Sequence, residues 1–88
     1  MFDSIYSSVS LNEMVKLAVG LTAKGIKFDA HSLYGGMQIN CGDWDAVCHG
    51  GSYGHERGLI EIMGRIVLND TGDTIEGWLT ADEILARL

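Results

Sequence analysis

The chain has 88 residues, of which 47% are hydrophobic and 20% charged, and its formal net charge is −6. This length suffices for one domain with one small core, and the composition is that of a globular protein rather than a disordered one. No apolar run approaches the ~18 residues of a membrane span, and residues 1–6 lack the pattern of a secretory signal. We therefore expect a single domain over residues 1–88 that acts in a cytoplasm, where its two cysteines stay reduced.

The charge distribution argues against one class of partner. Between Ile66 and Ala86 there is no Lys or Arg, and the acidic residues of this segment are Asp70, Asp73, Glu76, Asp82 and Glu83. Direct binding to nucleic acid needs a basic surface on the protein, so we do not expect it. An acidic segment either steers the protein toward a basic protein surface or serves only to keep the protein in solution.

Residues 11–24 are predicted to form the first helix, after an N-terminal arm over residues 1–9. Ser10 and Glu13 match a capping box, and apolar residues recur behind them at helical spacing. Gly25 fits the position that ends such a helix, and Gly20 within it suggests close packing against a sheet.

Three short strands are predicted next. Apolar and polar residues alternate over residues 26–33, 37–41 and 44–48, which gives half-buried strands. Tyr34-Gly35-Gly36 and Gly42-Asp43 separate them as tight turns. Consecutive strands joined in this way form an antiparallel meander.

Residues 59–67 fit two interpretations. Several apolar residues share one helical face, whereas two glycines weaken a helix and leave a strand over residues 59–63 open. The apolar residues are Leu59, Ile60, Met63, Ile66 and Val67, and the glycines are Gly58 and Gly64. A turn at residues 69–73 and an extended segment at residues 74–79 follow.

Thr80 and Glu83 form a second capping box, which opens a short C-terminal helix. The predicted order is α-β-β-β-α-(β)-α. This is an α+β domain with a small antiparallel sheet, a three-stranded meander to which a fourth strand can add, packed by helices.

The segment from Cys41 to His55 contains most of the side chains with distinctive chemistry. Cys41, Cys48, His49 and His55 are metal-ligand types, but their spacing contains no C-x-x-C. Buried thiols with loop histidines explain the same residues, so we predict neither a metal site nor a cofactor. A small metal- or anion-dependent enzyme that uses this loop stays open as an alternative.

Two further patterns resemble catalytic motifs. Residues 50–54 match G-x-S-x-G around Ser52, but that motif works within a parallel α/β sheet, for which this chain is too short. Cys48 and His49 are neighbours on a strand and therefore point to opposite faces. The glycine loop lacks the lysine of a phosphate-binding Walker motif. We expect no catalytic residues and no enzymatic activity.

Residues 52–56 read Ser-Tyr-Gly-His-Glu, residues 58–64 Gly-Leu-Ile-Glu-Ile-Met-Gly, and residues 76–83 Glu-Gly-Trp-Leu-Thr-Ala-Asp-Glu. These stretches resemble short uncharacterised proteins of phages and prophages of Gram-positive bacteria. The resemblance covers the C-terminal half of the chain and implies a mobile-element protein in a host cytoplasm. Small acidic phage proteins include inhibitors of host defence, notably anti-CRISPR proteins, so size, charge and setting imply such an inhibitor by analogy.

The predicted function is therefore a small, acidic, non-enzymatic protein that binds and inhibits a host protein, such as the basic nucleic-acid channel of a defence effector. Asp70, Asp73 and Glu76 are the predicted partner-binding acids, because side chains at a turn project into solvent. Tyr53 and Trp78 are the candidate apolar anchors, although the core is the favoured place for Trp78, as it is for Trp44.

A self-assembling structural protein is a further alternative. The predicted strand at residues 26–33 is a candidate edge strand, and an edge strand can pair with a copy of itself. The sequence does not define the oligomeric state.

Overall fold

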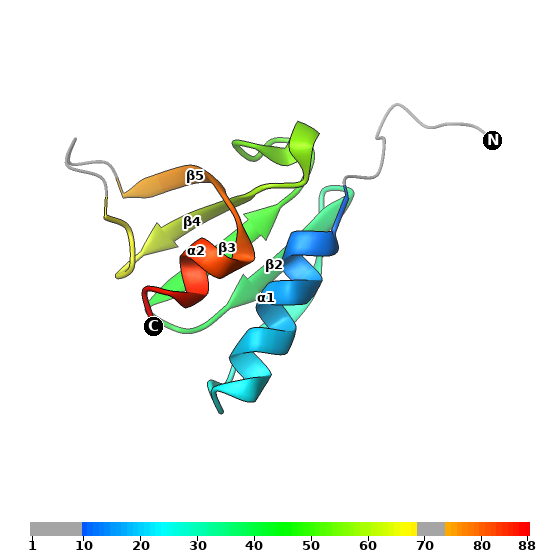
Figure 1. Ribbon diagram of the computed structural model, residues 1–88. Coiled ribbons are helices and arrows are strands. Elements are labelled where there is room, and N and C mark those ends of the chain that lie inside the picture. The colour runs from blue at the N-terminus through cyan, green and yellow to red at the C-terminus, as the bar shows by residue number, and fades with distance from the viewer. Residues whose placement is uncertain (1–9, 69–73) are drawn as a thin grey trace.

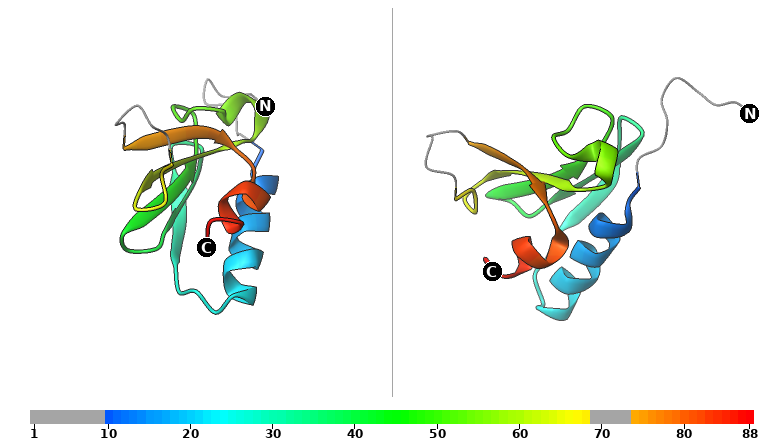
Figure 2. Two further views of the ribbon diagram at one scale, coloured as in Figure 1. Left: turned by 60° about the vertical axis from the view of Figure 1, so that its left-hand side comes forward. Right: turned by 45° about the horizontal axis from the view of Figure 1, so that its top comes forward.

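The computed structural model describes residues 10–68 and 74–88 (Figure 1). In these residues five strands form one antiparallel sheet in chain order, β1-β2-β3-β4-β5. The elements are α1 (Asn12–Ala23), β1 (Asp29–Leu33), β2 (Gly36–Asn40), β3 (Trp44–Cys48), the short 3-10 helix η1 (His55–Arg57), β4 (Ile60–Gly64), β5 (Ile75–Leu79) and α2 (Ala81–Leu85). The helices α1 and α2 pack against each other on one face of the sheet (Figure 2). None of the described helices has the length and hydrophobicity to span a membrane.

The predicted α+β class and the antiparallel meander are confirmed, but the meander has five strands rather than three or four. The helix predicted over residues 59–67 is wrong, and the strand alternative holds. Ile60 and Ile62 of β4 are fully buried, whereas Glu61 between them and Met63 after them are not. Because β3 and β5 flank β4 on both sides, they take up its backbone hydrogen bonds, and alternate residues reach the core.

The start of α1 differs from the prediction. Leu11 is the N-cap and provides no side-chain cap, so the capping box predicted for Ser10 and Glu13 is wrong. The carboxylate of Glu13 instead accepts a hydrogen bond from the backbone N–H of Ala81 at 2.7 Å. Glu13 therefore satisfies a free N–H at the first turn of α2 rather than one at the start of its own helix.

The end of α1 is as predicted. Gly25 has a φ of +72°, which glycine adopts without steric cost. Its N–H donates to the carbonyl of Thr22 and the N–H of Ile26 donates to the carbonyl of Leu21, each at 3.0 Å. These two bonds form a Schellman motif, which turns the chain from the helix toward β1.

The core lies between the helices and one face of the sheet. Its buried members are Met14, Leu17, Leu21, Ile39, Trp44, Ala46, Cys48, Ile60, Ile62, Ile66, Leu79, Ala81 and Ile84. A Cβ at Gly20 would collide with the side chain of Leu85 on α2. The close packing predicted at Gly20 is therefore against α2, and the predicted contact with the sheet is wrong.

The C-terminal helix begins at its predicted capping box. The hydroxyl of Thr80 accepts the N–H of Glu83 at 3.2 Å, and the Glu83 carboxylate accepts the N–H of Thr80 at 2.8 Å. Two of the free N–H groups at this helix end are satisfied reciprocally. The cap makes α2 a defined element although it is only five residues long.

Strand β1 is shorter and more exposed than predicted. It begins at Asp29 instead of Ile26, and the residues from Asp29 to Ser32 are exposed on both faces, so the half-buried pattern is wrong. The reason is that α1 packs over β2 and leaves β1 beyond the helix layer. The N-terminal arm and the turn carrying Asp70 and Asp73 lie outside the described residues.

Candidate functional site

Trp78 of β5 has an unusual backbone conformation. Its φ is +64°, a left-handed value that bulky side chains rarely adopt. The side chain is 50% exposed, so its predicted place in the core is wrong, whereas Trp44 is buried at 3% exposure. Conformations of this kind cost about 1–3 kcal/mol each and concentrate at functional sites. Trp78 therefore presents a large apolar surface to solvent at a cost to the fold.

A β-bulge produces this conformation. Leu79 pairs with Ile60 and Glu76 pairs with Ile62, so the register between β4 and β5 shifts by one residue. Two residues of β5, Gly77 and Trp78, thus lie opposite Glu61 alone. A bulge changes the direction of the side chains and increases the local twist. Trp78 therefore departs from the alternation of side chains between the two faces of the sheet.

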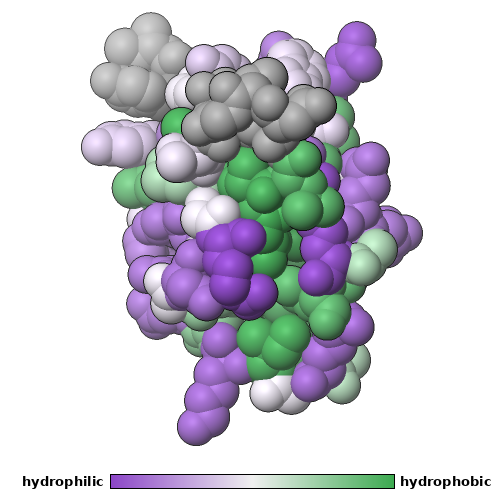
Figure 3. Space-filling view, turned by 90° about the vertical axis from the view of Figure 1, so that its left-hand side faces the viewer, coloured by the Kyte–Doolittle hydropathy of each residue, from purple (hydrophilic) through white to green (hydrophobic). Residues whose placement is uncertain are grey.

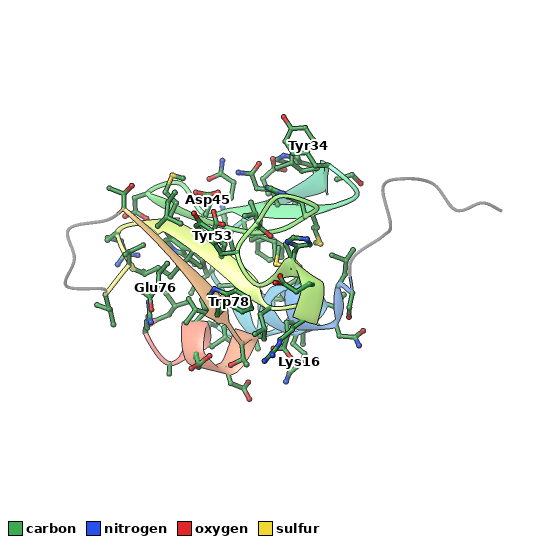
Figure 4. The ribbon with its side chains drawn as sticks, turned by 90° about the horizontal axis from the view of Figure 1, so that it is seen from above. Lys16, Tyr34, Asp45, Tyr53, Glu76 and Trp78 are labelled. Atoms are coloured by element: carbon green, nitrogen blue, oxygen red, sulfur yellow. The ribbon has the colours of Figure 1, made fainter. Side chains whose placement is uncertain are left out.

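The loop before η1 places Tyr53 directly against the bulge (Figure 4). The carbonyl of Tyr53 accepts the N–H of Trp78 at 3.4 Å, and the N–H of Tyr53 donates to the carboxylate of Glu61 at 2.8 Å. A Cβ at position 77 would collide with Tyr53, so Gly77 permits the two segments to cross. Tyr53 is 61% exposed. Tyr53 and Trp78 are two exposed aromatic residues joined through this backbone contact, and together they are called here the aromatic surface.

The structure brings these two predicted anchors together from segments far apart in the chain, and backbone contacts rather than side-chain packing hold them. The sequence analysis predicts no bulge, although a glycine inside a strand, here Gly77, is a known signal of one. The left-handed conformation of Trp78 has no such signal, because it depends on the register with β4.

Glu76, which was predicted to project into solvent beside the turn, is instead bound within the protein. The Glu76 carboxylate accepts hydrogen bonds from Arg87 at 2.8 and 2.7 Å and from the N–H of Leu68 at 3.0 Å. These hydrogen bonds lower the pKa of Glu76 to about 2, and the hydrogen bond from Arg87 has the largest effect. Glu76 is therefore part of an intramolecular ion pair, and its predicted solvent projection is wrong. Asp70 and Asp73 lie outside the described residues.

One carboxylate contacts the aromatic surface, and a second lies just after this loop in the chain. Glu61 receives the N–H of Tyr53, and Glu56 follows in η1 with more than half of its side chain exposed. Among the described residues near this loop, Arg57 of η1 supplies a positive charge. Glu61 is not among the predicted site residues, because its contact with Tyr53 depends on the position of the loop against β4.

Ser52 has a structural role. Its side chain is 3% exposed, its hydroxyl donates to the carbonyl of His49 at 3.1 Å, and it accepts the N–H of His49 at 3.0 Å. The carbonyl of Ser52 lies 2.6 Å from Nδ1 of His55. The hydroxyl thus closes the turn over residues 49–52, which explains the G-x-S-x-G pattern without a nucleophile.

Both cysteines are free thiols. Burial raises the pKa of Cys48, and burial together with Asp43 and Asp45 raises that of Cys41. A protonated thiol is a weak nucleophile and a weak ligand. In residues 10–68 and 74–88 no three His, Cys, Asp or Glu side chains lie close enough to hold a metal ion.

A second apolar region lies at the end of the molecule where the β4–β5 connection runs. Figure 3 shows hydrophobic surface there between hydrophilic side chains. Leu68 and Leu88 are exposed, and the segments that carry them are joined by the hydrogen bond of Arg87 to the Ile66 carbonyl at 2.9 Å. This region lacks a strained or aromatic residue among those described, so the aromatic surface is the stronger candidate.

The chain matches no protein-family model, and neither curated proteins nor solved structures give a match. These comparisons therefore add nothing to what the sequence and the geometry of this chain indicate.

Proposed function

We propose that this protein is a small non-enzymatic inhibitor that binds a host protein through the aromatic surface of Tyr53 and Trp78. The observation that carries the proposal is Trp78 itself, half exposed at a φ of +64°. A tryptophan that contributes little to its own core and is held in a costly conformation has its natural use in an interface. Trp and Tyr also supply much of the binding energy at protein interfaces.

The charge of the chain favours a basic partner. The formal net charge is −6, Glu61 accepts the N–H of Tyr53, and the exposed Glu56 lies in η1 just after this loop. Acidic residues at the rim of an interface raise the association rate with a basic surface, while buried aromatic anchors slow dissociation. The resemblance of the C-terminal half to phage proteins supplies the setting, a host cytoplasm. The proposed target is the basic nucleic-acid channel of an RNA-guided defence effector, which makes the protein an anti-CRISPR inhibitor.

The direct test uses purified RNA-guided nuclease complexes from Gram-positive hosts. Target-DNA cleavage and the dissociation constant of the complex are measured with wild type, Trp78→Ala and Tyr53→Ala. The matched control is Tyr34→Ala, which removes another exposed tyrosine from the turn between β1 and β2. We expect stoichiometric inhibition by wild type and by Tyr34→Ala. The two anchor variants should bind at least about 10-fold more weakly, as hot-spot residues do.

Two results would contradict the proposal. In one, wild type inhibits no effector at low ionic strength. In the other, Tyr34→Ala weakens binding as strongly as Trp78→Ala. The loss of affinity would then not be specific to the aromatic surface.

The acidic contribution is tested separately by reversing Asp70 and Asp73 to Lys. Glu76 is left in place, because a lysine there would face Arg87 and disturb the fold. The double variant should associate with the effector more slowly and with a flatter salt dependence, at an unchanged dissociation rate. Association that is identical to wild type at low salt would mean that these charges serve solubility alone.

A further inference from the structure

The two edges of the sheet differ in regularity. Strand β5 is bulged at Gly77 and Trp78, and the N–H of Trp78 already donates to Tyr53. Strand β1 pairs with β2 over five residues without a register shift, and no described strand lies beyond it. A regular, exposed edge strand can pair with another strand, whereas a bulge makes such pairing unfavourable. The open edge of this sheet is therefore β1.

The hydrogen bonds between β2 and β3 show which residues of β2 face which neighbour. The N–H of Cys41 donates to the carbonyl of Trp44 at 2.9 Å, directly after the paired residues of these strands. Hydrogen-bonded pairs alternate in an antiparallel ladder. Ile39 therefore directs its backbone groups to β3, while Gln38 and Asn40 direct theirs to β1.

The same alternation orients β1. Its residues opposite Gln38 and Asn40 are His31 and Asp29, which exchange hydrogen bonds with β2. Ala30 lies between Asp29 and His31, and Ser32 follows His31. The N–H and C=O groups of Ala30 and Ser32 therefore point to the free edge. These are the groups that a further strand would bind.

A second copy of β1 fits this edge in one preferred register. If a two-fold axis passes through Ala30, the two Ala30 residues exchange hydrogen bonds, and each Asp29 lies opposite His31 of the second copy. Moving the axis by one residue places either His31 against His31 or Asp29 against Asp29. Directly opposed like charges destabilise a strand pair and opposite charges stabilise it. Of these three registers, charge therefore selects the one centred on Ala30.

We propose that this protein forms a two-fold symmetric dimer in which β1 pairs antiparallel with β1 of a second copy, centred on Ala30. The dimer joins two five-stranded sheets into one continuous sheet. The interface is self-complementary, as two-fold dimers require. It lies at the edge opposite β5 and does not depend on the inhibitor function proposed for the aromatic surface.

The proposed interface is also sensitive to pH. Within one chain Nδ1 of His31 lies 4.0 Å from the Asp29 carboxylate. From β2 the neutral Gln38 lies opposite His31, and its amide donates to Asp45 of β3 at 2.9 Å. Lys27 precedes the strand and carries the nearest basic charge along the chain. In the dimer two Asp29 and two His31 side chains alternate, so protonated imidazoles strengthen the pairing.

Sedimentation equilibrium of the full chain, at micromolar to submillimolar concentrations, measures the dimer. The measurement is made at pH ~8 and pH ~5.5, which bracket the usual protonation of imidazole. We expect a reversible dimer whose dissociation constant falls about 10-fold at the lower pH, the equivalent of one strengthened ion pair per strand. A wild-type chain that stays monomeric at both pH values overturns the proposal.

One variant tests the edge. Ala30→Pro removes the central N–H while leaving the bonds of β1 to β2, because proline is tolerated on edge strands. It should abolish the dimer with unchanged circular dichroism. Trp78→Ala is the matched control and should dimerise as wild type does. Dimerisation of Ala30→Pro excludes this interface.

A charge exchange tests the register. Asp29→Lys and His31→Glu should each weaken the dimer, because each single change removes the opposite charges across the interface. The double variant Asp29→Lys/His31→Glu should restore it, since each introduced lysine then faces the introduced glutamate of the second copy. A double variant that dimerises no better than the single variants excludes the register centred on Ala30.

Discussion

The guanidinium of Arg87 donates from Nη1 and Nη2 to the two carboxylate oxygens of Glu76, at 2.8 and 2.7 Å. Nη1 also donates to the carbonyl of Ile66, and the Glu76 carboxylate receives the N–H of Leu68. Both side chains are largely shielded, at 16% and 21% exposure. The pair thus fastens the C-terminal end of the chain to both sides of the β4–β5 connection, with the bidentate geometry of a strong ion pair.

Replacing Glu76 by Gln should make the protein less stable at neutral pH and less sensitive to acid. The folded-state pKa of Glu76 is about 2, below its ordinary value of 4.5. Its stabilisation is therefore complete above pH 4.5 and is lost as the pH falls toward 2. Allowing for solvent screening, we expect a loss of roughly 1–2 kcal/mol at neutral pH.

Urea unfolding at neutral pH and at several acidic values measures this effect. In wild type the free energy of unfolding should fall more steeply in acid than in Glu76→Gln. The matched control, Glu56→Gln, removes an exposed carboxylate and should unfold like wild type. Parallel pH curves for wild type and Glu76→Gln would show that the ion pair does not stabilise the fold.

Replacing Gly20 by Ala should destabilise the protein, although alanine favours helix by about 1 kcal/mol. The added Cβ would collide with the end of the Leu85 side chain, so this side chain would have to leave its packed position between α1 and α2. In a Leu85→Ala background the same change should be neutral or stabilising, because the collision is absent. Thermal and urea unfolding of the four chains form a double-mutant cycle, and a coupling energy near zero would exclude this contact.

Removing the cap of α2 should have a local cost. In Thr80→Ala the N–H of Glu83 loses its acceptor, and we expect the free energy of unfolding to fall by about 1 kcal/mol. Thr80→Ser keeps the hydroxyl and is the matched control. If both variants lose the same stability, the methyl group of Thr80 rather than its hydroxyl matters. Urea denaturation resolves a difference of this size.

Replacing Trp78 by Gly should separate stability from binding. Glycine adopts a φ of +64° without strain, which offsets the loss of a half-exposed side chain. The free energy of unfolding should therefore change by less than about 1 kcal/mol, while binding to the effector is lost. Trp44→Ala is the comparison, because its buried ring should cost about 3–5 kcal/mol. Equal destabilisation by the two changes would assign Trp78 to the core.

The sequence by itself determined the elements whose signals are local. The Schellman end of α1 at Gly25, the turn at Tyr34 and Gly35, and the capping box of Thr80 depend on residues within a few positions of one another. Backbone preference and short-range hydrogen bonds suffice to specify such features. The tight turns at residues 34–36 and 42–43 likewise predicted the antiparallel meander, whereas the half-buried alternation predicted for the first strand is absent.

Only the tertiary structure decided the rest, because the deciding partners are far apart in the chain. Residues 60–64 form a strand since β3 and β5 lie on both sides, although their apolar spacing also fits a helix. Glu13 binds Ala81 rather than its own helix end, and Glu76 binds Arg87 rather than solvent. The exposure of Trp78 follows from the register shift against β4. Long-range register and pairing set the side-chain environment here, and no local pattern encodes them.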